Sequence, residues 1–244
     1  MFGSAQRAYL TATRHPWPCF LFLLPLLALY EGGVFWLGNG QPDSLRNGAD
    51  AWIRLGLEKL GVNQIVLAPL LLAVVFLCWS WFWRNNKPSD LLGVVAGMGI
   101  ESVVFALGLW ALCRMSLPFL EGLGITLAYP PIPSEDAGRV ITFIGAGIYE
   151  EALFRLLILG GLRWVLRQVG VPAVTAAAVA VISSAVLFSA AHHIGPFGEP
   201  FHAGRFVFRC LAGLYFALLF QFRGFGVAAG AHACYDVMVG IAVV

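Results

Sequence analysis

Apolar residues form long uninterrupted runs along this chain, and shorter segments between the runs carry most of the charges. A run of about 20 apolar residues is long enough to cross the hydrocarbon core of a membrane as a helix. The runs lack the alternation of apolar and polar residues that is typical of barrel strands, which favours helices. We therefore expect an all-α, polytopic membrane protein. The pattern predicts seven spans: residues 18–37, 64–83, 91–115, 140–160, 171–193, 205–222 and 225–244.

The segment 44–62 has a different pattern, in which Trp52, Ile53 and Leu57 are interleaved with Asp50 and Arg54. Such a mixture is typical of an amphipathic helix that lies at the membrane interface. The helix is either a plain connector between two spans or a guide that leads a partner molecule into the bundle.

Composition supports a membrane protein and excludes other classes. Hydrophobic residues make up 59% of the 244 residues and charged residues 11%, and the mean hydropathy is +0.82. A soluble domain of this size needs more surface charge. The net charge of +2 argues against a nucleic-acid partner. The five cysteines form no CxxC pair and indicate neither a disulfide framework nor a cysteine-based metal site.

Basic residues fall on alternate loops, with Arg7 and Arg14 before the first predicted span and Arg84, Arg163 and Arg223 after later ones. Because short cytoplasmic loops are enriched in Lys and Arg, this distribution predicts a cytoplasmic N-terminus. We expect an integral protein of a bacterial cytoplasmic membrane.

An acidic pair, Glu150 and Glu151, interrupts the predicted span 140–160, and Arg155 follows one helical turn later. A charge at the centre of a bilayer costs about 3 kcal/mol, so such residues are usually functional. Residues four apart share a helix face, whereas adjacent residues diverge by about 100°. We therefore expect Glu151 and Arg155 to form an ion pair and Glu150 to face a cavity, where it can act as a general base.

Two histidines on later predicted spans each have a companion four residues away: Phe188 with His192, and His232 with Asp236. Two imidazoles around one carboxylate can orient a water, take its proton and donate hydrogen bonds to a developing oxyanion. This chemistry needs no Ser or Cys nucleophile. The chain also lacks the HExxH pattern of zinc proteases.

The motifs Glu150-Glu-Ala-Leu-Phe-Arg155, Phe188-Ser-Ala-Ala-His192 and His232-Ala-Cys-Tyr-Asp236 match EExxxR, FxxxH and HxxxN/D. In that order, on separate apolar segments, they resemble the CAAX-processing and bacteriocin-processing (CPBP) family of intramembrane glutamic endopeptidases. The resemblance covers roughly residues 140–244. From the composition and the apolar runs we expect residues 1–244 to form a single integral membrane domain. Residues 1–139 would supply the N-terminal helices and the interfacial segment. Residues 140–244 would supply the last four helices of the chain, which are the catalytic helices and build the cavity.

The resemblance also implies roles. Glu150 would activate a water that His192 holds, and His232 with Asp236 would line the oxyanion site. Glu151, Arg155 and Phe188 would support this arrangement, and no metal or organic cofactor would be needed.

Family members that process prenylated CAAX proteins commonly have Asn where this chain has Asp236. An ionised Asp cannot donate a hydrogen bond to an oxyanion. Either Asp236 is protonated, or it orients His232.

The resemblance implies hydrolysis of a peptide bond in a membrane-embedded or lipid-anchored substrate, by glutamate-activated water. The substrate, the cleavage position and the oligomeric state stay open. Three alternatives remain: a zinc-dependent membrane protease, a proton-coupled transporter that uses Glu101, Glu150, Glu151 and the histidines, and a non-catalytic scaffold with a buried ion cluster.

Two expectations concern geometry. Glu150 and His232 fall near the middle of their predicted spans, whereas His192 falls on the order of 15 Å from the middle of its own. Glu31 and Glu101 also lie within or near apolar runs, and we expect them to pair with an interior arginine such as Arg209.

Overall fold

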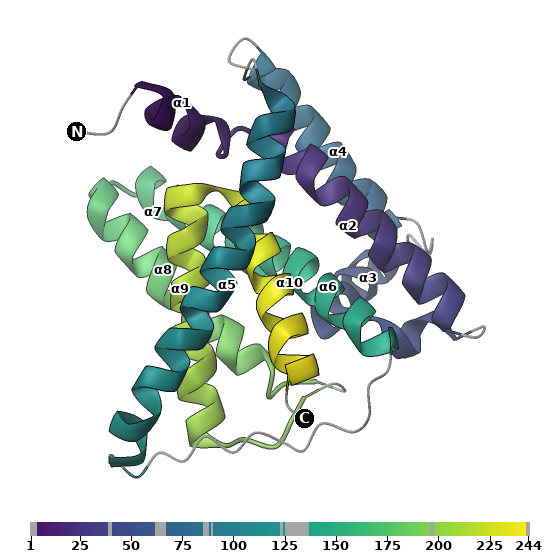
Figure 1. The fold of residues 1–244 in the computed structure, drawn as a ribbon, viewed down its shortest axis with the longest axis vertical. Coiled ribbons are helices and arrows are strands. Elements are labelled where there is room, and N and C mark those ends of the chain that lie inside the picture. Colours follow the sequence, from purple (N-terminus) through teal and green to yellow (C-terminus); the bar gives the residue numbers. More distant parts are fainter. Residues whose placement is uncertain are drawn as a thin grey trace.

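The computed structural model describes residues 4–38, 41–61, 67–84, 88, 90–122, 124, 137–195 and 198–242. Every regular element in these ranges is helical (Figure 1), which confirms the all-α prediction. The elements are α1 Ser4–Ala12, α2 Pro16–Leu37, a short 3-10 turn Pro42–Leu45, α3 Gly48–Lys59, α4 Leu67–Phe82, α5 Leu91–Gly122, α6 Ala137–Glu151, a π-helical segment Ala152–Leu159, α7 Gly160–Gln168, α8 Ala173–Ala191, α9 Ala203–Arg223 and α10 Phe225–Ala242.

Four of the described helices are long and apolar enough to cross a membrane: α2, the part of α5 from Leu91 to Ser116, α8 and α9. Helix α4 is apolar but shorter, over Ala68–Phe82. The predicted spans 140–160 and 225–244 overlap α6 with its π-helical continuation and α10. The protein is therefore an integral membrane protein, and seven crossings stay a prediction.

Helix α6, the π-helical segment and α7 follow one another without a break. The π-helical hydrogen-bond pattern reaches the N–H of Gly160, which donates to the carbonyl of Arg155 five residues earlier. Wide turns of this kind often occur at functional sites. Here the widening begins directly after Glu151, and the sequence pattern did not predict it.

Helix α10 lies at the centre of the bundle and packs against α5, α6, α9 and α2. Its small side chains allow close approach: Ala228, Ala229 and Ala231 are fully buried. On α6, a Cβ added to Gly147 would lie 2.6 Å from the backbone nitrogen of Ala233 and 2.7 Å from the carbonyl oxygen of Ala229. Glycine at this position therefore lets the two backbones touch, which brings the residue before Ala233 next to α6.

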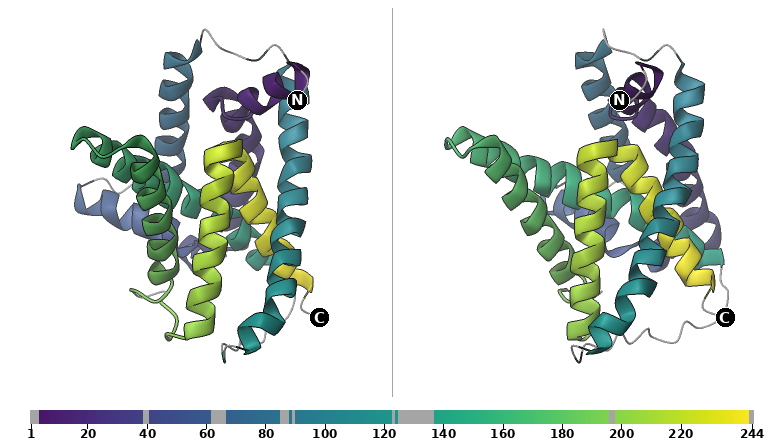
Figure 2. Two further views of the ribbon diagram at one scale, coloured as in Figure 1. Left: turned by 90° about the vertical axis from the view of Figure 1, so that its left-hand side faces the viewer. Right: turned by 60° about the vertical axis from the view of Figure 1, so that its left-hand side comes forward.

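Figure 1 shows α6 running obliquely to α5 and α10 rather than parallel to them. In the right-hand view of Figure 2, α8 leans so that its first residues stand away from α9 and its last residues approach it. The end of α8 can therefore reach the middle of the α6–α7 helix, although the two segments would be far apart in a bundle of parallel helices.

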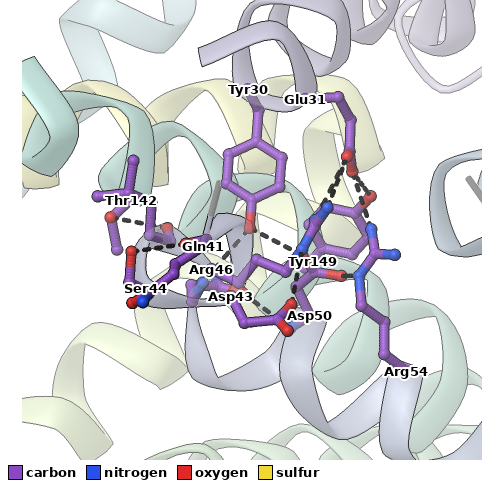
Figure 3. Close-up of polar contacts among 12 residues, drawn as sticks. Tyr30, Glu31, Gln41, Asp43, Ser44, Arg46, Asp50, Arg54, Thr142 and Tyr149 are labelled. Carbon is purple, nitrogen blue, oxygen red and sulfur yellow. Dashed lines mark hydrogen bonds and ion pairs between the residues drawn. The ribbon is translucent and has the colours of Figure 1, made fainter. Parts of the chain in front are cut away.

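Helix α3 confirms the helix predicted within residues 44–62, but its first turns direct charged side chains inward. Asp50 is fully buried and pairs with Arg46 and Arg54, each at 2.7 Å (Figure 3). Leu55 and Leu60 are exposed instead.

The ion pairs of the buried acids differ from the expected ones. Glu31 pairs with Arg46 and Arg54, and Glu101 pairs with Arg223 at 2.7 Å. Both acids are thus paired as expected, but the choice of Arg209 was wrong. Arg209 pairs with Glu199, in the loop that precedes its own helix α9. Sequence spacing carries no information on which arginine an acid meets across the bundle.

Candidate active site

The three motifs of the sequence meet at one point. Oε2 of Glu150, on α6, lies 3.8 Å from Nε2 of His192, which directly follows α8. The same oxygen lies 3.8 Å from Nε2 of His232, on α10. The sequence placed His192 away from the middle of its span, whereas Glu150 lies near the middle of its own. Because α6 runs obliquely, the two side chains nevertheless meet. Both separations are longer than a hydrogen bond, so one carboxylate oxygen faces two imidazoles without being tied to either.

The backbone fixes the orientation of the His192 ring. Its Nδ1 lies 2.8 Å from the carbonyl oxygen of Phe188, one turn earlier. A carbonyl oxygen only accepts, so Nδ1 carries the proton and donates it. In the neutral ring, Nε2 is then a bare acceptor directed toward Glu150. A water between the two side chains can donate one proton to each.

His232 is held on three sides. Its Nδ1 lies 3.0 Å from Oε1 of Glu151, and its ring stacks on Phe216 with centroids 4.4 Å apart and an interplanar angle of 12°. Phe188 meets the ring edge-on at 5.8 Å. An ionised Glu151 only accepts, so Nδ1 donates to it. Nε2 is thereby aimed at Glu150.

Asp236 approaches His232 from the next turn of α10. Its Oδ2 lies 3.4 Å from Nε2 of His232. A contact between an imidazole nitrogen and a carboxyl oxygen needs one proton, on either the ring or the acid. This geometry is compatible with both readings of Asp236, as a protonated acid or as the group that orients His232.

Glu151 and Arg155 lie behind these groups and form the expected pair, with Arg155 Nε 3.1 Å from Glu151 Oε2. Both side chains are 0% exposed. The guanidinium also donates to Ser184 Oγ at 2.9 Å and lies 5.2 Å from the ring centre of Phe188. Ser184 in turn donates to the carbonyl of Phe154 in the π-helical segment at 2.8 Å. This pair therefore joins α6 to α8.

Exposure separates the residues that can meet a substrate from those that cannot. The side chains of Glu150, His192 and Asp236 are 13%, 25% and 26% exposed, and that of His232 is 4% exposed, whereas those of Glu151 and Arg155 are 0% exposed. A pocket of about 110 Å³ adjoins the exposed side of Glu150. It is lined by Gly48, Ala49, Trp52, Glu150, Leu153, Phe154, Ala191, His192 and Ile194.

Sequence reasoning missed two contributors. Ser184 lies four residues before Phe188 and eight before His192, so Ser184 and Phe188 share a face of α8 and His192 follows on the same side at its end. That spacing was a usable signal. Trp52 comes from α3, far from the motifs in sequence, and no spacing rule connects it to them.

No group of three or more His, Cys, Asp or Glu side chains within the described ranges is arranged so that it could hold a metal ion.

Residues 137–238 match the family model described as type II CAAX prenyl endopeptidase Rce1-like. The match begins with α6, ends within α10 and includes all seven site residues predicted from the motifs. Residues 137–238 of this membrane protein are thus similar to Rce1-like endopeptidases. No curated protein and no solved structure matches the chain. The Rce1-like match therefore carries the functional assignment, and it leaves out α1–α5 and with them Trp52.

Proposed function

We propose that this protein is a glutamic intramembrane endopeptidase, in which Glu150 activates the water that cleaves a peptide bond. The single observation that carries the proposal is the position of Glu150 Oε2, 3.8 Å from an imidazole nitrogen of both His192 and His232. A general base must lie within reach of the proton it takes, directly or through one water.

The reaction follows from the orientation of each group. The water donates one hydrogen bond to Nε2 of His192 and gives its other proton to Glu150, while its oxygen attacks the carbonyl carbon. In this step His232 is an imidazolium: its Nδ1–H donates to Glu151 and its Nε2–H donates to the oxyanion that forms, while Asp236 positions the ring. The intermediate collapses when the C–N bond breaks, and Glu150 returns its proton to the leaving amine.

The buried pair of Glu151 and Arg155 acts through His232 in this scheme. Glu151 accepts the proton on Nδ1 and so keeps Nε2 directed toward the reacting atoms, as partners behind a functional histidine commonly do. Arg155 neutralises Glu151, and both side chains are 0% exposed.

We infer that the substrate is a membrane-anchored or transmembrane peptide, because the site lies between membrane helices. The family description makes a prenylated C-terminus the first candidate, and Asp236 in place of Asn keeps the other candidates open: a sorting helix, a bacteriocin-like peptide and a membrane-bound regulator. We place the N-terminus in the cytoplasm of a bacterial cell, with residues 1–244 as one integral membrane domain.

The test uses purified protein in detergent with fluorogenic lipidated and transmembrane peptides. Glu150→Gln should abolish cleavage, and His192→Ala and His232→Ala should each lower it at least a hundredfold. Glu121→Gln, the same chemical change at an exposed position of α5, is the matched control and should cleave like wild type.

Each assay is run with and without a metal chelator. Cleavage that resists the chelator and is lost with Glu150→Gln supports the proposal. Cleavage lost with the chelator assigns the chemistry to a metal. Cleavage that survives Glu150→Gln overturns the mechanism. Ion flux through reconstituted vesicles, without any cleavage, supports the transporter alternative.

A further inference from the structure

The pocket beside Glu150 is built from two parts of the chain. One wall consists of Leu153 and Phe154, which follow Glu150 in the π-helical segment. The opposite wall consists of Ala49 and Trp52 on α3, outside the family match. Apart from Glu150 and His192 the lining is apolar, so an apolar group that enters it lies against the carboxylate.

Trp52 spans the gap between α3 and the turn after α8. A Cβ added to Gly195 in that turn would lie 3.5 Å from the indole nitrogen of Trp52, which is ordinary van der Waals contact. Ile194, beside it in the turn, also lines the pocket. The indole therefore closes one side of the pocket, and its size sets how much room remains.

The first turns of α3, which carry Trp52, are held by a polar network around the buried Asp50 (Figure 3). Asp50, two residues earlier, accepts from Tyr30 at 2.8 Å and from Arg46 and Arg54 at 2.7 Å each.

Glu31 completes the network from α2. It pairs with the same two arginines and accepts a hydrogen bond at 2.8 Å from Tyr149, the residue before Glu150. Helix α3 is thus joined to α6 at the point where α6 carries the proposed base. Moving α3 away from α6 would therefore break several of these ion pairs.

The volume of the pocket limits the size of the substrate group that can enter it. A protein cavity of about 150 Å³ is known to hold benzene, and this pocket is smaller, at about 110 Å³. A small aliphatic group such as isopropyl or isobutyl therefore fits this space more readily than an aromatic ring does.

We propose that this pocket is the subsite for one aliphatic side chain of the substrate, next to the bond that is cut, and that Trp52 determines the size of that side chain. This inference rests on the proposed endopeptidase function. It adds a specificity-determining residue from the N-terminal half of the chain.

The test compares kcat/KM for peptides that differ at one position beside the scissile bond: Ala, Val, Leu or Phe. Wild type should prefer Val and Leu to Phe. Trp52→Ala enlarges the pocket and should lower the Leu/Phe ratio at least tenfold, since small changes of fit in an apolar pocket alter rates by about 10- to 200-fold. Trp164→Ala, at an exposed tryptophan of α7, is the matched control and should keep the wild-type ratio.

A second variant changes the pocket in the opposite direction. Ala49→Leu fills the space and should lower kcat/KM for the Leu peptide at least tenfold, while cleavage of the Ala peptide is spared. This variant decides the matter if Trp52→Ala fails to fold. An unchanged Leu/Phe ratio in folded Trp52→Ala, or equal losses for all peptides in Ala49→Leu, overturns the inference. Neither result bears on Glu150→Gln, which tests the endopeptidase function separately.

Discussion

The ion pair between Glu151 and Arg155 predicts an unusual pattern of stability. Both side chains are fully buried and 3.1 Å apart. Removing one partner of a buried pair costs about 3–5 kcal/mol because the other charge is left uncompensated. Replacing both partners by apolar residues of similar volume is often neutral. The single variant Arg155→Met should therefore lose about 3–5 kcal/mol in the free energy of unfolding.

The double variant Glu151→Leu with Arg155→Met should lose less. It leaves no buried charge, but it removes the acceptor of His232 Nδ1 at 3.0 Å. One unsatisfied buried donor costs about 1–3 kcal/mol. Ser184 keeps its own hydrogen bond to the carbonyl of Phe154 and adds nothing to this cost. The double variant should thus be about 2 kcal/mol more stable than the single variant.

Equilibrium unfolding in mixed detergent micelles, followed by tryptophan fluorescence, measures both losses. Arg163→Met is the matched control, because the guanidinium of Arg163 donates to Gln221 at an exposed position; its loss should stay below about 0.5 kcal/mol.

The double variant should recover part of its stability without recovering peptidase activity. The protein should fold and yet cleave no peptide, because His232 has lost the group that fixes its ring. The reasoning is refuted if Arg155→Met loses less than about 1 kcal/mol, or if the double variant is less stable than the single one.

Three further predictions follow from buried or charged contacts. Ser184→Ala should cost about 1–3 kcal/mol of unfolding free energy, because a buried carbonyl and a buried guanidinium each lose a partner. Gly147→Ala should destabilise the protein and lower cleavage, since its Cβ meets the α10 backbone at 2.6 Å, whereas Gly161→Ala, with open space around it, should not. Partial burial raises the pKa of Glu199, but the hydrogen bond and charge of Arg209 and the charge of Arg205 outweigh this and lower it overall. The stability difference between wild type and Glu199→Gln should therefore be present above the ordinary carboxyl pKa and disappear as the pH falls through the lowered one, which thermal unfolding at several pH values measures.

The sequence determined the class of the fold and the chemistry of the site. Long apolar runs can satisfy their backbone in a membrane only as helices, so the all-α bundle follows from hydropathy. A spacing of four residues predicted the contact of Glu151 with Arg155 and the contact of His232 with Asp236. Spacing is sufficient here because the two residues of each pair lie on the same helical segment.

The tertiary structure decided everything that joins different helices. The crossing of α6 brings His192 to Glu150, and this crossing depends on a backbone contact at Gly147 and on the widened turns after Glu151. The arginines that meet Glu31 and the wall that Trp52 forms are likewise contacts between elements far apart in sequence. Periodicity describes one helix at a time, whereas these contacts are set by the angle and distance at which helices pack, which depend on the fit of side chains from all of them.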